Sequence, residues 1–329
     1  EISLGLVGSE MCIRDRASEA GGPTSPAHSP QAPARRSTQE PHPRYDPTAP
    51  GAVVMKRPSE KHQQLYGGGL PVVDVVLDPD LTRVLRPHQI EGVRFLYEAV
   101  TGMTSLELGH TSPGQGAILA DEMGLGKTLQ TITLVLTLLR QSCYFSSVTT
   151  GTIGKVLIAC PLTLVANWKR EFRKWIGRSS IGFLAVEGDG RSEVERFVSG
   201  RQYQVLIIGY DRLRNCAKEL ARAHASIGLI VCDEGHRLKS KDAKTTKCFD
   251  LFPTKRRVLL TGTPIQNDLG ELYAMVDFVY PGLFDKYSVF KRVFEDPIVR
   301  SRMHNCSKHA LELGAARQQA VRSDVCLRC

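Results

Sequence analysis

From about residue 84 onwards, the sequence alternates between short apolar runs and longer segments that repeat apolar residues at helical spacing. The short runs are continuous in Val, Ile and Leu, which is typical of strands buried on both faces of a sheet. The longer segments each carry one apolar face and predict helices that pack on that sheet. The alternation predicts an α/β fold with a parallel sheet flanked by helices. The expected strands are 117–120, 156–160, 181–186, 205–209, 228–232 and 257–260, and the expected helices are 86–100, 165–176, 191–199, 211–222 and 268–279, with one more from Lys127.

The remaining segments predict how the chain is divided. Residues 17–60 are rich in Pro, Ala, Ser and Arg and have few apolar side chains to offset the entropy of ordering, so we expect a disordered tail. This tail could be plain, or it could bind partners. Residues 1–16 begin with Glu and look like an adapter or cloning scar, so they are left out of the fold prediction. We expect a lead-in at 61–83, a folded lobe at 84–285 and a helical extension at 286–329, with loops at 101–116 and 141–154.

Composition narrows the classes of partner. With 329 residues and 42% hydrophobic residues, the chain can bury a substantial core. The net charge of +9 favours a polyanionic partner, and Lys and Arg cluster at 169–174, 239–247 and 255–257, although solvated faces also produce such clusters. No apolar run approaches the roughly 18 residues that cross a membrane, so no membrane partner is expected.

The nine cysteines are scattered, and most stand singly in apolar runs, which is typical of a reduced compartment. Cys326 and Cys329 form a lone CxxC pair with no second pair nearby, so we expect no zinc site there.

A glycine-rich turn follows the first expected strand, in AILADEMGLGKTLQT at 117–131. Gly124 and Gly126 allow the backbone to bend so that its N–H groups converge, and the positive end of a helix follows. Lys127 can then reach the β- and γ-phosphates of ATP, and the Thr128 hydroxyl can hold Mg. The general pattern has glycine where Asp121 stands, so a structural turn is the alternative interpretation.

Two carboxylates end another expected strand, in LIVCDEGH at 229–236. The carboxyl edge of a parallel sheet is where ligands bind. Asp233 is suited to hold Mg, and Glu234 is suited to activate the attacking water. An exposed acidic turn is the alternative. His236 could link this site to the next motif, or could simply begin a helix.

Further polar groups stand near other element ends. TGTPIQN at 261–267 places the Thr261 and Thr263 hydroxyls after a strand, where they could couple nucleotide state to a bound polymer or form an ordinary turn. Gln89 could recognise an adenine edge, because an amide both donates and accepts, or could be a surface helix residue. CPLTLVANWKREFRKW at 160–175 offers hydroxyls and a helix N-terminus that could hold phosphates. Trp168 and Trp175 in this helix are expected in the core rather than against bases.

DEMGLGKT, DEGH and TGTPIQN, in this order, resemble motifs I, II and III of the SWI/SNF family of DNA-dependent ATPases in helicase-like superfamily two. RPHQIEG resembles that family's adenine-contacting motif, which favours the adenine role for Gln89. The resemblance implies a RecA-like P-loop lobe and a DNA path along motif Ia, CPLTLVANW, and motif Ib, IGYDRLR at 208–214. The DNA-contacting residues that it implies are Pro161, Thr163, Asn167, Tyr210 and Arg212.

The opening LRPHQIEGVRFLYE and the block at 286–308 are similar to the recombination-repair translocases of the Rad-fifty-four type. The resemblance covers roughly 68–316 and implies a nuclear, ATP-dependent translocase on double-stranded DNA that acts on recombinase filaments and chromatin. Motifs IV to VI are not found, and the family's second lobe supplies arginines to the ATP site, so we expect this stretch alone to be inactive. Two other functions stay open: a strand-separating DNA or RNA helicase, and a non-catalytic module that docks DNA or recombinase.

Overall fold

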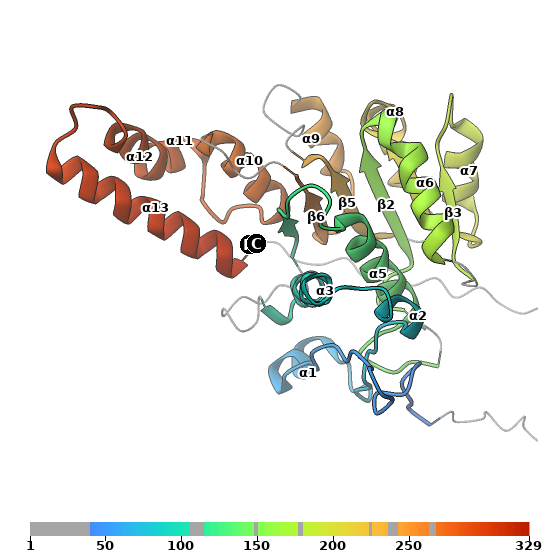
Figure 1. Cartoon of the computed structure of the whole chain (residues 1–329). Helices are drawn as coiled ribbons and strands as arrows, with labels where there is room; N and C mark the ends of the chain where they lie inside the picture. The colour runs from blue at the N-terminus through green and yellow to red at the C-terminus, as the bar shows by residue number, and fades with distance from the viewer. Residues whose placement is uncertain are drawn as a thin grey trace, which may run out of the picture. The chain divides into compact units, whose positions relative to one another are not determined.

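A computed structural model describes residues 40–104, 115–147, 151–176, 180–223, 226–235, 243–262 and 268–328. Its centre is a six-stranded parallel sheet in the order β1-β6-β5-β2-β4-β3 (Figure 1). The strands follow continuous apolar runs, because both of their faces are covered. Their bounds are β1 Ala117–Leu119, β2 Lys155–Cys160, β3 Gly182–Ala185, β4 Tyr203–Gly209, β5 Ile227–Asp233 and β6 Arg257–Leu260.

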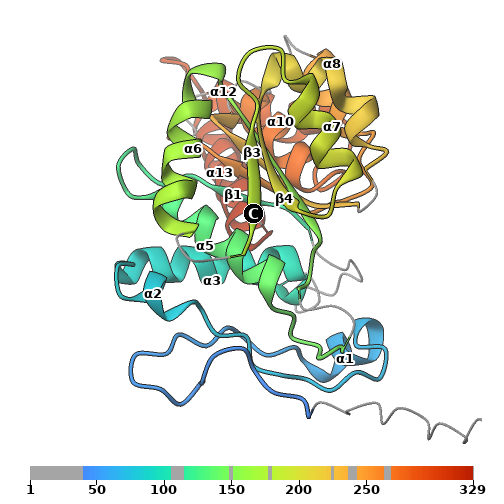
Figure 2. The ribbon, with the colours of Figure 1, turned by 90° about the vertical axis from the view of Figure 1, so that its right-hand side faces the viewer.

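Helices cover both faces of the sheet, as Figure 2 shows. Alternate residues of each strand belong to two separate apolar clusters, one on each face. One face is covered by α3 (Pro87–Thr101), α5 (Lys127–Arg140) and α6 (Leu162–Ile176). The other is covered by α7 (Arg191–Ser199), α8 (Tyr210–Leu220), α9 (Ala243–Phe249) and α10 (Leu269–Val279). The predicted α/β class, with a parallel sheet flanked by helices, is therefore confirmed.

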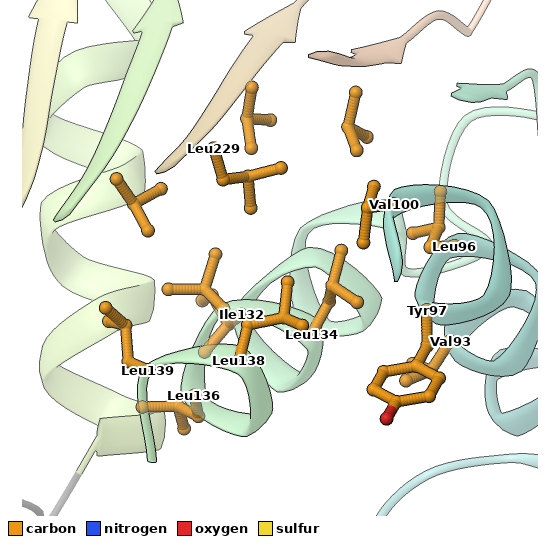
Figure 3. Packing of buried hydrophobic residues seen from close by; sticks show 14 of the residues in the cluster. Val93, Leu96, Tyr97, Val100, Ile132, Leu134, Leu136, Leu138, Leu139 and Leu229 are labelled. Atoms are coloured by element: carbon orange, nitrogen blue, oxygen red, sulfur yellow. The ribbon is translucent and has the colours of Figure 1, made fainter. Parts of the chain in front are cut away.

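In the cluster on the face covered by α3, α5 and α6, side chains of α3 and α5 pack against the strands (Figure 3). Val93, Leu96 and Val100 of α3 and Ile132 and Leu138 of α5 are all fully buried. Burying a side chain of this size contributes about 1.5–3 kcal/mol. This packing fixes the start of α5, where the glycine-rich turn ends.

The predicted elements match closely and differ only at their ends, whereas α9 was not predicted. The helix expected at 165–176 begins at Leu162, and the strand expected at 228–232 continues to Asp233. The helix expected at 191–199 has those bounds. Among the described helices, none combines the length and apolar content needed to cross a bilayer.

The folded part begins before residue 61, which differs from the tail predicted for 17–60. Met55 is buried, its N–H donates to Val75, and the N–H of Leu77 donates to Val53. The side-chain amide of Gln141 both donates to and accepts from the backbone of Val76. These partners are distant in sequence, so the average composition of 17–60 does not reveal them. Two short helices follow, α1 (Glu60–Tyr66) and α2 (Pro79–Thr82). They lie in the stretch for which the sequence predicted only a lead-in.

The predicted helical extension consists of α11 (Tyr287–Phe290), a π-helical turn η3 (Lys291–Glu295), α12 (Asp296–Ser301) and α13 (Lys308–Arg328). Phe290 and Val321 join the apolar cluster on the α10 face of the sheet. Gly314 of α13 lies against Ser301 of α12, where a side chain larger than hydrogen would overlap. The extension therefore packs as a continuation of the lobe.

Candidate functional site

Three neighbouring strands end at the same level on the carboxyl edge of the sheet. Leu119 of β1 and Asp233 of β5 both pair with Leu260 of β6. The N–H of Thr261 then donates to the carbonyl of Leu119, with 3.1 Å between N and O. The glycine-rich turn, the acidic pair and the start of TGTPIQN therefore leave the sheet side by side.

The glycine-rich turn has the backbone conformation that the sequence predicts. Gly124 and Gly126 have φ of 90° and 86°, a region that side chains with a Cβ rarely adopt. Gly126 precedes α5, and no side chain caps that helix. The first N–H groups of α5 are thus available to an anion. Thr128 lies half-buried in the first turn of α5.

Lys127 points along this edge. Its Nζ donates to the carbonyls of Asp121 and Glu122, at 2.6 and 3.0 Å. A Cβ added to Gly262 would lie 3.8 Å from Nζ, so the lysine reaches the start of TGTPIQN. Its charge also helps to lower the pKa of Asp233, against the stronger effect of burial. Lys127 and Asp233 therefore share one edge of the sheet, as the sequence predicts.

Gln89 contacts the glycine-rich turn from α3. It is 8% exposed, its Nε2 donates to the carbonyl of Leu125 at 3.0 Å, and its Oε1 accepts from the N–H of Arg86 at 2.9 Å. Both ends of the amide are thus engaged inside the protein. Gln89 lies beside the nucleotide turn, and its contact with adenine stays a prediction.

Gln130 was not predicted as a site residue. It contacts Asp121, which stands where the general phosphate-loop pattern has glycine. Its Nε2 donates to Oδ2 of Asp121 at 3.0 Å, and Gln130 is fully buried. The available signal was a polar residue on the apolar side of α5. Asp121 is therefore fixed by a side chain rather than by the turn alone.

Asp233 is constrained at both of its carboxylate oxygens. Its Oδ1 accepts the N–H of Glu234 at 2.9 Å, and its Oδ2 accepts the indole N–H of Trp168 at 2.8 Å. Burial raises its pKa above 3.8, and these two hydrogen bonds oppose that rise. Glu234 has φ of 52°, an uncommon conformation for a residue with a Cβ, which turns the chain sharply after β5.

The candidate DNA-contacting residues follow β2 and β4, which end in register at Cys160 and Gly209. Thr163 is exposed in the first turn of α6, whereas Pro161 is buried. Asn167 is half-buried, and its Oδ1 accepts from Arg170. Arg212 donates to the carbonyl of Gly188 at 2.6 Å.

Tyr210 differs from the expectation of a DNA contact. It is 9% exposed, and its hydroxyl donates to the carbonyl of Asp233 at 2.7 Å. The Tyr210 side chain is therefore buried in the lobe and bonded to its backbone, so it is not exposed to DNA. Trp168 is 1% exposed, which confirms the predicted core position. Trp175 is half-buried and donates to Oε2 of Glu171 at 2.8 Å.

His236 and Thr263 lie outside the described residues, as do Lys239 and Lys241. The described part of the chain holds no group of three or more His, Cys, Asp or Glu side chains arranged to bind a metal. Mg is commonly held by one or two protein oxygen ligands together with the phosphates of the nucleotide. The carboxylate of Asp233 keeps unused lone pairs beside its two hydrogen bonds, so it fits that ion.

Six cysteines of the described part are free thiols: Cys143, Cys160, Cys216, Cys232, Cys248 and Cys306. Burial raises the pKa of Cys143, Cys216 and Cys248 to about 11. They are therefore protonated and unreactive near neutral pH.

Comparison with known proteins places this site in a family. The family model described as the SNF2-related domain matches residues 88–326, from α3 into α13. The chain belongs to the SNF2-related family. Similar members of the SNF2-related family are "DNA repair and recombination protein RAD54B" of Gallus gallus and of Homo sapiens, which are 46% and 45% identical. Each alignment covers 84% of this chain and 29% of the relative.

A yeast relative is "DNA repair and recombination protein RDH54" of Saccharomyces cerevisiae, 41% identical over 76% of this chain and 29% of its own length. The chain thus spans about 30% of the length of the curated relatives that it matches. Among solved structures, the Sulfolobus solfataricus SWI2/SNF2 ATPase core in complex with dsDNA is 29% identical, with a TM-score of 0.53, over 71% of this chain and 43% of that one. The same core domain solved separately has a TM-score of 0.50 and supports the fold.

Proposed function

We propose that this chain is the RecA-like, ATP-binding lobe of an ATP-dependent translocase on double-stranded DNA, which acts in homologous recombination repair. The observation that carries the proposal is the shared sheet edge, where Lys127 and Asp233 lie next to a helix N-terminus without a side-chain cap. The names of the RAD54B and RDH54 relatives and the DNA-bound SWI2/SNF2 core support the DNA and repair parts.

In this proposal, Gly124, Gly126 and the first turn of α5 bind the phosphates, and Lys127 neutralises the β- and γ-phosphates. Magnesium held by Thr128 and Asp233 would stabilise the charge that develops on the transferred phosphate. Glu234 orients the attacking water and accepts its proton. Gln89 contacts the adenine edge of ATP.

Coupling and DNA contact belong to neighbouring strand ends. Thr261, Thr263 and His236 would link nucleotide state to DNA. Thr261 follows β6 at this edge, and the other two come shortly after β6 and β5 in the sequence. Thr163, Asn167 and Arg212 would hold DNA phosphates beside them, in a nuclear protein that also meets recombinase filaments and chromatin. The exposed position of Thr163 supports this track.

The test of nucleotide binding compares the 329-residue chain with Lys127→Ala and Glu234→Gln. Wild type is expected to bind a fluorescent ATP analogue more tightly with Mg than in EDTA. Lys127→Ala should lose most of this binding, whereas Glu234→Gln should keep it, because Glu234 acts on water rather than on phosphate. A Lys127→Ala chain that binds as tightly as wild type would contradict the site, and the docking-module function would then be preferred.

Hydrolysis by this chain alone is expected to be slow, since an arginine supplied to the developing charge accelerates such reactions by about 10³–10⁵. Single-turnover hydrolysis, compared with a relative that carries both lobes, measures this. Stimulation of the two-lobed protein by duplex DNA is expected to exceed stimulation by single-stranded RNA. The reverse order would favour a strand-separating helicase.

A further inference from the structure

Asp233 is held by hydrogen bonds from both faces of the sheet. Trp168 lies in α6, which packs on one face, and Tyr210 lies in α8, which packs on the other. The Trp168 indole donates to the carboxylate, and the Tyr210 hydroxyl donates to the backbone carbonyl of the same residue.

We propose that Trp168 and Tyr210 are positioning residues for magnesium: from opposite sides of the sheet, Trp168 fixes the carboxylate of Asp233 and Tyr210 fixes its backbone carbonyl. This inference rests on the proposed function, because it assumes that Asp233 holds the ion. Neither side chain needs to touch ATP or metal. Trp168 fixes where Oδ2 of Asp233 points, and Tyr210 fixes the backbone that carries this side chain. Groups that orient a metal ligand are commonly worth 10–100-fold in metal affinity.

The geometry favours this role over simple core packing. A buried indole N–H needs a hydrogen-bond acceptor, and a neutral one would be sufficient. Trp168 instead donates to the carboxylate of Asp233, at 2.8 Å. A hydrogen bond to a charged group is stronger than one to a neutral group and is directional. With Oδ2 engaged by Trp168 and Oδ1 by the N–H of Glu234, rotation of the carboxylate is restrained at both oxygens.

The two helices that carry these donors begin at the strand ends where DNA contact is proposed. Trp168 lies about one and a half turns after Thr163, and Tyr210 is two residues before Arg212. α6 and α8 are therefore each connected to Asp233 by one hydrogen bond. A shift of either helix would change the position of Asp233.

The chain contains a matched control for each variant. Trp175 also donates its indole N–H to a carboxylate at 2.8 Å, but on Glu171 of its own helix. Tyr273 also donates its hydroxyl to a backbone carbonyl at 2.7 Å, but on Asp285, after α10. Trp175→Phe and Tyr273→Phe thus remove bonds of the same kind away from the site.

The experiment measures the affinity of the 329-residue chain for a fluorescent ADP in EDTA and in saturating Mg. In EDTA, Trp168→Phe and Tyr210→Phe should bind as wild type does, since the phosphate turn is intact. The gain in affinity on adding Mg should fall about tenfold in Trp168→Phe and about threefold in Tyr210→Phe. Both controls should keep the full gain, and Trp168→Phe should have no further effect in an Asp233→Asn background.

An unchanged magnesium gain in Trp168→Phe and Tyr210→Phe, with EDTA binding intact, would overturn the inference and leave the proposed function standing. A wild-type chain whose ADP affinity ignores Mg would overturn both. Because a shortened core side chain can unfold the lobe, a second measurement uses Trp168 itself. The sequence has two tryptophans, so Trp175→Phe leaves Trp168 as the single emitter. Its emission should change saturably with Mg in the presence of ADP, and unaltered emission would also reject the role.

Discussion

The two glycines of the phosphate turn share a backbone conformation but differ in their surroundings. Both have φ near 90°, in the left-handed region. A Cβ on Gly124 would meet nothing within 4 Å, whereas a Cβ on Gly126 would overlap the amide of Gln89. Gln89 can move aside only by giving up its hydrogen bond to Leu125.

Gly124→Ala is expected to destabilise the lobe by about 1 kcal/mol through backbone strain alone. Gly126→Ala should cost about 1 kcal/mol more, because it also breaks the Gln89 hydrogen bond. Urea unfolding of the two variants measures the difference. The extra cost should vanish when Gln89→Ala is added to both, and a difference that survives there would show that Gln89 is not its source.

Lys155 is a buried charge outside the site. It is 2% exposed, and its Nζ donates to the carbonyls of Phe197 and Gly200, which end α7. Burial lowers its pKa below 10.5. Between the lowered value and 10.5, the unfolded chain binds more protons than the folded chain, so stability contributed by this group rises with pH.

The free energy of unfolding of wild type, relative to Lys155→Met, should therefore increase as pH rises toward 10.5. The slope cannot exceed about 1.4 kcal/mol per pH unit for one proton. Urea titrations of both proteins from pH 7 upward give this difference directly. A difference that stays flat or falls would mean that the ammonium is well compensated by the two carbonyls.

At the scale of elements, the strands and helices of the lobe were predictable because their patterns are local. The continuous apolar run of β2 and the single apolar face of α6 each identify an element without its neighbours. The sequence predicted that β1, β5 and β6 end at one edge of the sheet. It could not predict their register, because register depends on pairing between segments that are distant in the sequence. The backbone hydrogen bond of Met55 to Val75 was missed for the same reason.

The candidate site shows the same division. Gly126 and Lys127 were identified because their chemistry lies within one short motif. Trp168 and Tyr210 were placed in the core and on the DNA path, respectively, and their common partner Asp233 was not foreseen. Which acceptor a buried indole finds is decided by how α6 packs on the sheet, and the spacing of residues in the sequence does not reveal this.

The contact between α12 and α13 depends on Gly314. A Cβ there would overlap Ser301 and lie 3.1 Å from the carbonyl of Pro297. Gly314→Val should therefore separate the two helices and cost about 1–3 kcal/mol. Ala315→Val, on an exposed position of the same helix, is the control and should cost well under 1 kcal/mol.

Hydrogen exchange would locate the effect of Gly314→Val. Faster exchange is expected in α12 and α13, with α5 and the nucleotide affinity unchanged. Loss of nucleotide binding in Gly314→Val alone would mean that the helices after α10 support the site more directly than their contacts indicate.

At the scale of the whole molecule, the net charge of +9 favours a polyanionic partner. The proposed contacts to DNA phosphates would make binding sensitive to salt. If Arg212 contacts a DNA phosphate, Arg212→Ala should make the slope of log affinity against log salt shallower by about 0.9. Arg83→Ala, an exposed arginine of the N-terminal segment, should leave the slope unchanged. Fluorescence anisotropy with a duplex oligonucleotide at several salt concentrations measures both, and equal slopes for Arg212→Ala and wild type would remove Arg212 from the track.

The position of β6 has a consequence for how the lobe matures during synthesis. Among the described strands, β1 pairs with β6 alone, and β6 is the last strand made. A nascent chain in which Leu260 is still inside the ribosome has its glycine turn on a strand with no neighbour. When β6 pairs with β1 and β5, the site is completed. We therefore expect ribosome-bound chains to acquire the ability to retain ATP in a single step.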